Sequence, residues 1–324
     1  MLKTIKPKTA RSARALRKRE PKIQENPKTA IFLRGHKTNN IINTALSDLC
    51  ALKKPDAITF SKKNEILPFE DDTSLEFFSQ KNDASLFVIG NHTKKRPQNL
   101  IFARMFDGQV LDMIEVGVVN AKSIADFKTP KCAVGMKPCF LFNGDLFETS
   151  EIHKKFKNML LDLFRGQTVK SINLSGIEHV ISVTASPPQK DDGDPSTGIV
   201  YFRTYTVQMK KSGQRIPRVE LEEMGPSFDF QFRRTKFAKE DVYMAATRVP
   251  KELKPKKIKN IDVNEIGDRV GRIHLGKQDL SQLQTRKMKG LKKRAIEEID
   301  AMDIEEINKE DDEEEISPNK RQKV

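Results

Sequence analysis

Short apolar runs that end in glycine or in a polar turn recur from about residue 29 to residue 237. Two of these runs, residues 31–35 and 140–144, have the length and composition of short strands. Each is followed by a segment whose apolar positions recur at helical spacing, residues 39–52 and 150–164. Strands interleaved with helices favour a domain of the α/β class.

The same order of elements occurs twice within this span. Later in each half the pattern predicts a strand, a polar loop, a second strand and a final strand that ends in glycine. Arg104 and Arg203 fall at the same place in the two copies, and the second copy has the longer hairpin. We therefore predict one α/β domain, residues 29–237, made of two similar halves (about 29–125 and 138–237) around a pseudo-twofold core.

The two ends of the chain have a different composition. Residues 1–28 contain ten basic and two acidic side chains, with too few apolar neighbours to offset the entropy of ordering, so we predict a disordered basic arm. Residues 238–324 are predicted to be a charged extension, which we expect to be flexible from about residue 251 to residue 324. It contains a basic segment (286–294), an acidic segment with twelve carboxylates (297–315) and a short basic end (320–323).

The overall charge indicates the kind of partner. The chain has 59 Lys and Arg against 45 Asp and Glu, a formal charge of +14, and a pI near 9.5. Such a protein attracts polyanions. No apolar run approaches the ~18 residues of a membrane span, so a soluble intracellular protein is expected. Three cysteines without a CxxC pair suggest neither a disulfide framework nor a zinc site.

Known catalytic motifs do not occur in the sequence. The five histidines are scattered, and neither a HExxH nor a GxSxG motif is found. We therefore expect no enzymatic activity, no cofactor, no metal site, no small-molecule substrate and no membrane association.

A polar loop at residues 92–97 is the first candidate for RNA binding. Lys94, Lys95 and Arg96 are adjacent, precede Pro97, and lie between two apolar strands. Strands hold such a loop in fixed geometry, and its cations can neutralise phosphates and release counterions. The alternative is a solvated hairpin tip.

A second candidate lies in the last strand of the domain. Phenylalanines alternate with polar residues from 228 to 232, which predicts one apolar face, and Arg233 follows on the opposite face. Arg234 either falls on the apolar side or ends the strand. Together with Lys236 these residues predict a second RNA-binding patch, and the alternative is a solvated sheet edge.

The junction between the first strand and its helix is a third candidate. Arg34, His36 and Lys37 lie there, and one of residues 38–40 is expected to cap the helix. Backbone amides at such a helix start suit a phosphate. A nucleotide-binding P-loop is not indicated, because the required glycine is replaced by Phe32.

Other basic residues have two interpretations. Arg104 and Arg203 could each form an ion pair inside the fold or contact RNA. The clusters at the two ends of the chain resemble nuclear import signals, the alternative being solvated tail charge. The residues concerned are Arg17, Lys18, Arg19, Lys320, Arg321 and Lys323.

Four segments resemble the Brix-domain family of ribosome assembly proteins, over about residues 28–237. They are FLRGHKTNN (32–40), IGNHTKKRPQNLIFARMFDG (89–108), LSGIEHVISVT (174–184) and PRVELEEMGPSFDFQFRR (217–234). The resemblance implies a duplicated α/β unit similar to anticodon-binding domains, which agrees with the internal repeat.

The resemblance also implies a function. It implies a nucleolar factor that supports pre-rRNA processing and recruits 5S rRNA, with its two ribosomal proteins, to the large (60S) subunit. It further implies contact with large-subunit rRNA and a heterodimer with the protein called regulator of ribosome synthesis. The alternative is a protein-interaction scaffold or chaperone for basic ribosomal proteins that uses the acidic tail, with incidental RNA contact.

Overall fold

The computed structural model forms two units, Met1–Lys254 and Pro255–Val324, which are described separately. In the second unit, β10 (Ile261–Val263) pairs antiparallel with β11 (Arg269–Gly271). The segments 286–294, 297–315 and 320–323 lie outside the described residues, so the predictions made for them stay predictions. The structure describes residues 7–20, 22–23, 25–169, 171–187, 198–214, 216–254, 258–264, 268–271 and 276.

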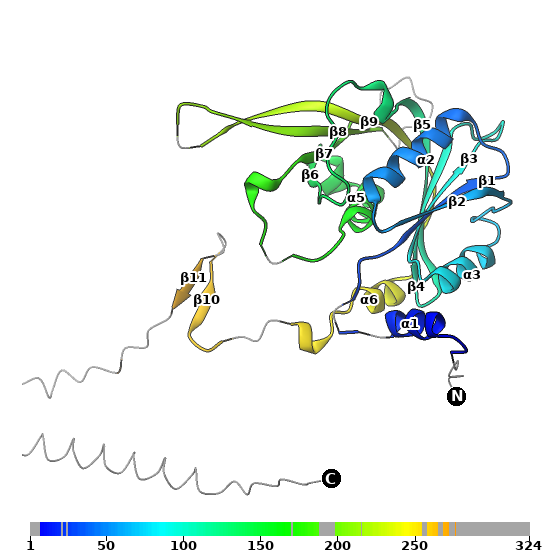
Figure 1. The fold of residues 1–324 in the computed structure, drawn as a ribbon, viewed down its shortest axis with the longest axis horizontal. Helices are drawn as coiled ribbons and strands as arrows, with labels where there is room; N and C mark the ends of the chain where they lie inside the picture. Colours follow the sequence, from blue (N-terminus) through cyan, green and yellow to red (C-terminus); the bar gives the residue numbers. More distant parts are fainter. Residues whose placement is uncertain are drawn as a thin grey trace, which may run out of the picture. The chain divides into compact units, whose positions relative to one another are not determined.

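The first unit is built on one large mixed sheet (Figure 1). Its first half contributes the strands β1 (Ala30–Gly35), β2 (Ala57–Asn64), β3 (Leu86–Asn91), β4 (Asn99–Phe106) and β5 (Gln109–Lys122). Its second half contributes β6 (Cys139–Asn143), β7 (His179–Ala185), β8 (Ile199–Lys210) and β9 (Arg218–Lys236). The α-helices are α1 (Ala10–Arg19), α2 (Asn40–Lys53), α3 (Thr73–Asn82), α4 (Leu146–Thr149), α5 (Glu151–Phe164) and α6 (Glu240–Ala246). Short 3-10 turns are η1 (Ile124–Asp126), η2 (Leu174–Gly176) and η3 (Lys251–Leu253).

The strand order confirms the predicted duplication. The order is β2-β1-β3-β4-β5-β9-β8-β7-β6. The pairs β1/β3 and β6/β7 are parallel, whereas the pairs from β3 to β5, from β7 to β9 and at β5/β9 are antiparallel. The halves are therefore equivalent about the β5/β9 pair. The first half has β2 and α3 in addition, which the sequence pattern did not predict.

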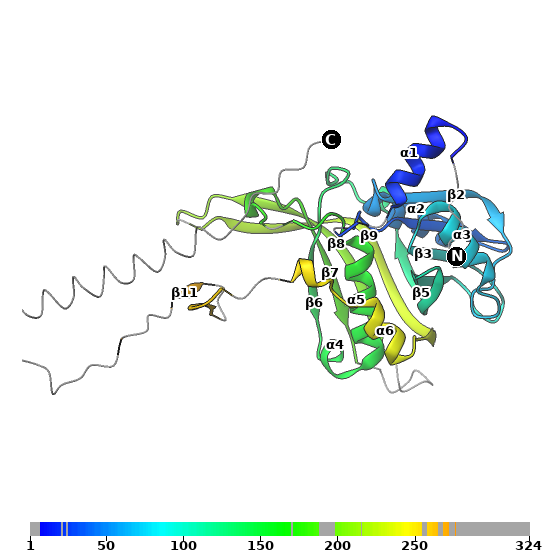
Figure 2. The same cartoon turned by 90° about the horizontal axis from the view of Figure 1, so that it is seen from below.

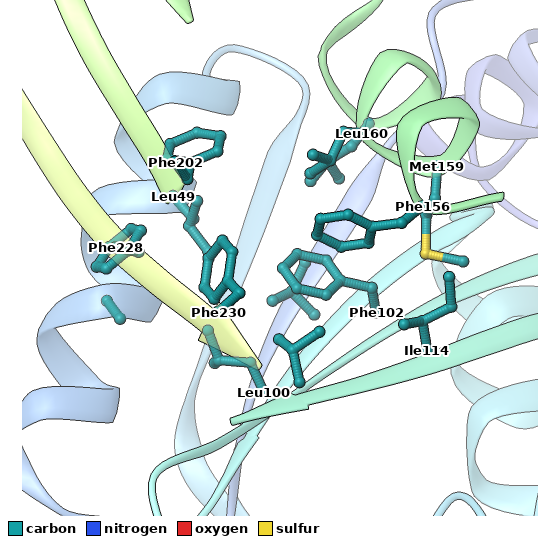
Figure 3. Packing of buried hydrophobic residues seen from close by; sticks show 14 of the residues in the cluster. Leu49, Leu100, Phe102, Ile114, Phe156, Met159, Leu160, Phe202, Phe228 and Phe230 are labelled. Carbon is teal, nitrogen blue, oxygen red and sulfur yellow. The ribbon is translucent and has the colours of Figure 1, made fainter. Parts of the chain in front are cut away.

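The main core lies between the sheet and the helices α2 and α5 (Figures 1 and 3). On α5 the buried positions recur at helical spacing and include Phe156, Leu160 and Leu163. The predicted alternation in β9 is confirmed, because Phe228 and Phe230 are buried in this core. Their rings pack edgewise or tilted against those of neighbouring phenylalanines.

The opposite face of the sheet differs between the halves. In the first half a second apolar cluster, which includes Leu75 and Phe78 of α3, covers it. In the second half the connection between α5 and β7 has only the short turn η2 in its described part. Tyr201 and Tyr205 of β8 therefore remain half-buried on that face.

The β8–β9 hairpin extends well beyond the rest of the sheet (Figures 1 and 2). Val207 lies opposite Leu221 and Met209 opposite Val219, so four apolar side chains share one face of the ribbon. Met209, Val219 and Leu221 are exposed. This hairpin is the longer one that the sequence repeat predicts.

The basic arm contains a helix over residues 10–19, which the sequence pattern did not predict. Thr9 and Ser12 form a capping box at the start of α1. At its end, Arg19 donates hydrogen bonds to the carbonyl oxygens of Gln80 (3.4 Å) and Lys81 (2.6 Å). Local capping and this contact with α3 supply the stabilisation that the apolar content lacks.

Candidate nucleic-acid interface

Two arginines of β9 face one buried glutamate of β5. Val116 is paired with Phe232 and Ile114 with Thr235, so the register shifts and Glu115 faces both Arg233 and Arg234. Such a shift places consecutive side chains on the same side of a strand. Arg234 therefore joins Arg233 on the face opposite α5, and β9 continues to Lys236. Both positions left open for Arg234, the apolar side and the end of the strand, are thus wrong.

Glu115 binds several groups at once. Its side chain has 0% exposure, and its carboxylate accepts hydrogen bonds from both Nε and Nη2 of Arg234. Asn99 Nδ2 donates to Glu115 Oε1 at 2.5 Å, and Arg96 Nε lies 3.9 Å from the same oxygen. A buried carboxylate needs such partners, because an unpaired charge away from water is costly.

Arg233 is fixed by different contacts. Its Nη1 donates to Asn99 Oδ1 at 3.0 Å, and its guanidinium lies so close to Gly117 that a Cβ there would overlap it. Burial lowers the pKa of Arg233; Glu115 opposes that shift and the charge of Arg96 adds to it. The guanidinium of Arg234 lies 4.3 Å from the centre of the Phe69 ring, a cation–π contact.

The loop between β3 and β4 is also fixed. Arg96 N donates to Thr93 Oγ1 and Thr93 N to Arg96 O, each at 3.1 Å. His92 N donates to Lys37 O at 2.8 Å, which brings the β1–α2 junction beside this loop. Lys94 and Lys95 are exposed.

These contacts unite most of the predicted residues. Lys236, in β9, forms an ion pair with Asp72, the N-cap of α3. His36 and Lys37 are exposed at the β1–α2 junction, where Asn39 caps α2 by accepting from Ile42 N. We call the following set the basic surface: His36, Lys37, Lys94, Lys95, Arg96, Arg233, Arg234 and Lys236.

Arg104 does not belong to the basic surface, and its proposed RNA contact is wrong. It is 6% exposed, forms an ion pair with Asp112 and donates to Asn158 Oδ1 at 2.6 Å. Burial alone lowers the pKa of Arg104, but the hydrogen bond and charge of Asp112, with help from Asp162, reverse the shift and raise it. Arg104 is therefore a structural cation.

Arg203 and Arg34 lie apart from the basic surface. Phe202 of β8 and Phe102 of β4 are buried in the same core. Arg203 is one residue from Phe202 and so points to the opposite face of the sheet, whereas Arg104 is two residues from Phe102 and points to the same face. The two arginines are therefore not equivalent. Arg203 pairs with Asp229 at 2.5 Å. Arg34 lines a cavity of about 150 Å³ beside α2.

Sequence reasoning missed the residues that organise the arginines. Glu115, Asn99 and Phe69 hold them in place, and Gly117 leaves room for one of them. One signal was available, because Glu115 lies between Ile114 and Val116 in a run that is apolar apart from this residue and Asp112. A charge at such a place predicts a buried partner.

The arrangement suits phosphate binding. Several cations converge, and those of Lys94 and Lys95 are exposed to solvent. Within the described part of the chain, no group of His, Cys, Asp and Glu side chains is placed to hold a metal ion. Among the described helices, none is long and apolar enough to cross a membrane.

Comparison with known proteins identifies the class. The Brix-domain model matches residues 35–234. The chain therefore belongs to the Brix-domain family, a family of ribosome biogenesis factors.

Within this family, the chain is similar to proteins named ribosome production factor 2 homolog. The Schizosaccharomyces pombe protein is 50% identical over 89% of this chain and 91% of its own length. The Homo sapiens protein is 51% identical over 83% of this chain and 85% of its own. A probable ribosomal biogenesis protein from Aeropyrum pernix K1 aligns with 65% of this chain and 99% of its own, with 11% identity and a TM-score of 0.41. The family assignment does not depend on that structure.

Proposed function

We propose that the protein is a non-enzymatic RNA-binding assembly factor of the large (60S) ribosomal subunit. The observation that carries the proposal is a set of three arginines around one wholly buried carboxylate, Glu115. Arg234 and Arg96 lie beside this carboxylate, and Arg233 is held by Asn99, which itself donates to Glu115. Cations that are already positioned lose less conformational entropy on binding a phosphate. RNA would be recognised by its backbone and shape, because A-form helices hide most base edges from side chains.

The resemblance to ribosome production factor 2 supports a more specific role. In this role the protein recruits 5S rRNA and its two ribosomal proteins into pre-ribosomes and supports pre-rRNA processing in the nucleolus. The basic clusters at residues 17–19 and 320–323 would direct nuclear entry. Arg203, half-buried on the sheet face opposite α5, is a further candidate RNA contact, and Arg34 remains a candidate beside α2.

A protein partner is part of the proposal. We propose a heterodimer with regulator of ribosome synthesis, as the resemblance implies. Support comes from the sheet face of the second half, which no described helix covers, and from the exposed Met209, Val219 and Leu221 of the β8–β9 ribbon, since exposed apolar patches mark interaction sites. The second candidate function, a chaperone for basic ribosomal proteins, is favoured by the twelve carboxylates of residues 297–315.

Salt dependence of binding to a 5S rRNA transcript tests the proposal. Lys94→Gln/Lys95→Gln removes two exposed cations without touching Glu115. Each lost phosphate contact should flatten the slope of log affinity against log salt by about 0.7 to 0.9. Lys62→Gln/Lys63→Gln, two exposed cations of the edge strand β2, is the matched control.

The outcomes separate the two candidate functions. We expect a flatter slope and weaker binding for the loop variant only. Equal slopes for the loop variant, the control and the unaltered chain would remove the loop from the interface. An unaltered chain that binds basic ribosomal proteins but shows no salt-dependent RNA binding would favour the chaperone. Crosslinking RNA in cells and sequencing the crosslinked sites would identify the RNA helix.

A further inference from the structure

We infer that helix α1 is a second RNA-binding surface, and that it contacts the same double-stranded RNA segment as the basic surface. The inference rests on the proposed function and adds to it. It assigns the basic arm a binding role besides nuclear import.

The arginines of α1 form a stripe. Arg11, Arg14 and Arg17 are exposed, whereas Ala13 and Leu16 are half-buried. Residues three apart are offset by ~60° around a helix and by ~4.5 Å along it, so the three guanidiniums lie within about a third of the circumference. Within Ala10–Arg19 there is no acidic residue to neutralise them.

The stripe is held at a defined place. Arg19 donates to the last carbonyl groups of α3, at Gln80 and Lys81, where a helix favours a cation. The capping box at Thr9 fixes the other end of α1. Arg19 is thus used for attachment, and the stripe is presented by a formed helix rather than by a random chain.

The charges of the stripe have no acidic partner among the described contacts of the chain. Arg14 Nε donates only to Ala10 O, at 3.4 Å, and Arg11 and Arg17 form no ion pair there. Three exposed, unneutralised guanidiniums suit phosphates. A helix ~10–12 Å wide does not enter the deep, narrow major groove of A-form RNA, so contact with the backbone is expected.

Helix α3 connects the two surfaces. Its last residues hold Arg19, and its N-cap, Asp72, holds Lys236 of the basic surface. Its ten residues make it about 15 Å long. Double-stranded RNA-binding domains cover about 16 base pairs, so one duplex can reach both surfaces. The second contact is then intramolecular and raises the affinity at a high effective concentration.

The test uses the full chain and an RNA hairpin with a stem of about 20 base pairs. Arg11→Gln/Arg14→Gln/Arg17→Gln removes the stripe, and glutamine maintains helix propensity. The control, Lys62→Gln/Lys63→Gln/Lys128→Gln, removes three exposed cations elsewhere. We expect the stripe variant, but not the control, to flatten the slope of log affinity against log salt by about 2 to 3. Combined with Lys94→Gln/Lys95→Gln, the stripe variant should flatten the slope further.

Each other outcome has a distinct meaning. If the stripe variant matches the control while the loop variant still loses affinity, the inference is wrong and the proposed function stands. If the unaltered chain shows no salt-dependent binding to the hairpin, the proposed function itself fails. If the stripe variant binds RNA normally but loses binding to poly-glutamate, α1 serves an acidic protein and the inference is overturned.

Discussion

Removing either partner of the Glu115–Arg234 pair should destabilise the fold, but by unequal amounts. Glu115 is fully buried, whereas 36% of the Arg234 side chain is exposed. Arg234→Met leaves a carboxylate inside the protein with only Asn99 and the more distant Arg96 as partners. Breaking a buried pair in this way costs about 3 to 5 kcal/mol, and we expect the lower end because Arg96 can approach.

Glu115→Gln should cost less. The freed Arg234 can turn toward water, and glutamine retains one oxygen that can accept from Asn99 Nδ2. What is lost is mainly two charge-assisted hydrogen bonds, worth about 1 to 2 kcal/mol after the released guanidinium is solvated. In Glu115→Gln/Arg234→Met neither charge remains, so the double variant should be more stable than the sum of the single losses implies, by about 1 kcal/mol or more.

Urea unfolding of the four proteins at pH 7.5 measures these free energies. Lys236→Met is the control, because its pair with Asp72 is solvent-exposed and should contribute no more than ~1 kcal/mol. The reasoning would be refuted by a Glu115→Gln loss that equals or exceeds the Arg234→Met loss. That result would show that the guanidinium of Arg234 cannot turn toward water and be solvated when Glu115 no longer carries a charge.

Two further predictions follow from buried groups. Gly117→Ala should displace the guanidinium of Arg233, and should therefore weaken RNA binding and flatten the salt slope by up to ~0.9. The free energy of unfolding should change by less than ~1 kcal/mol. The control is Gly176→Ala, where a Cβ meets no atom within 4 Å, and it should change neither RNA binding nor the free energy of unfolding. Burial lowers the pKa of His153 and of His179 below the ordinary 6.5, with Glu178 opposing the shift at His179. The unfolded chain then binds protons more readily, so the free energy of unfolding should be highest above pH 6.5 and fall below it, by at most ~1.4 kcal/mol per pH unit for each histidine. Urea unfolding at pH 7.5 and 5.5 should show a smaller drop for His153→Phe than for the unaltered chain, and equal drops would contradict this account.

Some elements were predictable because their signal is local. The apolar runs of β1 and β4 and the helical spacing of α5 are visible in a few adjacent residues. The edge strand β2 was not predictable from the sequence, since half of its eight positions are exposed and it has little apolar periodicity. Helix α1 depends on a capping box and on a contact with α3. The contact joins Arg19 to Lys81, which lies 62 residues further along the chain, so a local pattern does not reveal it.

The arginine site shows the same limit more sharply. Arg233 and Arg234 are conspicuous in the sequence, but Glu115, the ion-pair partner of Arg234, lies 119 residues before it. Only the register shift between β5 and β9 brings all three to one face. Sequence reasoning therefore found the charges that could contact RNA, and could not find the residue that positions them.

The position of this site at the seam of the duplicated fold has a further consequence. Glu115 and Asn99 belong to the first half and Arg233 and Arg234 to the second, and the β5/β9 pair is where the halves join. Neither half alone can form the arginine cluster. A loss of pairing between β5 and β9 would separate Glu115 from Arg234, leaving a buried acid without its main partner while dispersing the cations. The proposed RNA binding by the basic surface and the docking of the two halves would thus depend on the same ion pair, so we expect any factor that weakens the pairing of β5 with β9 to weaken RNA binding as well.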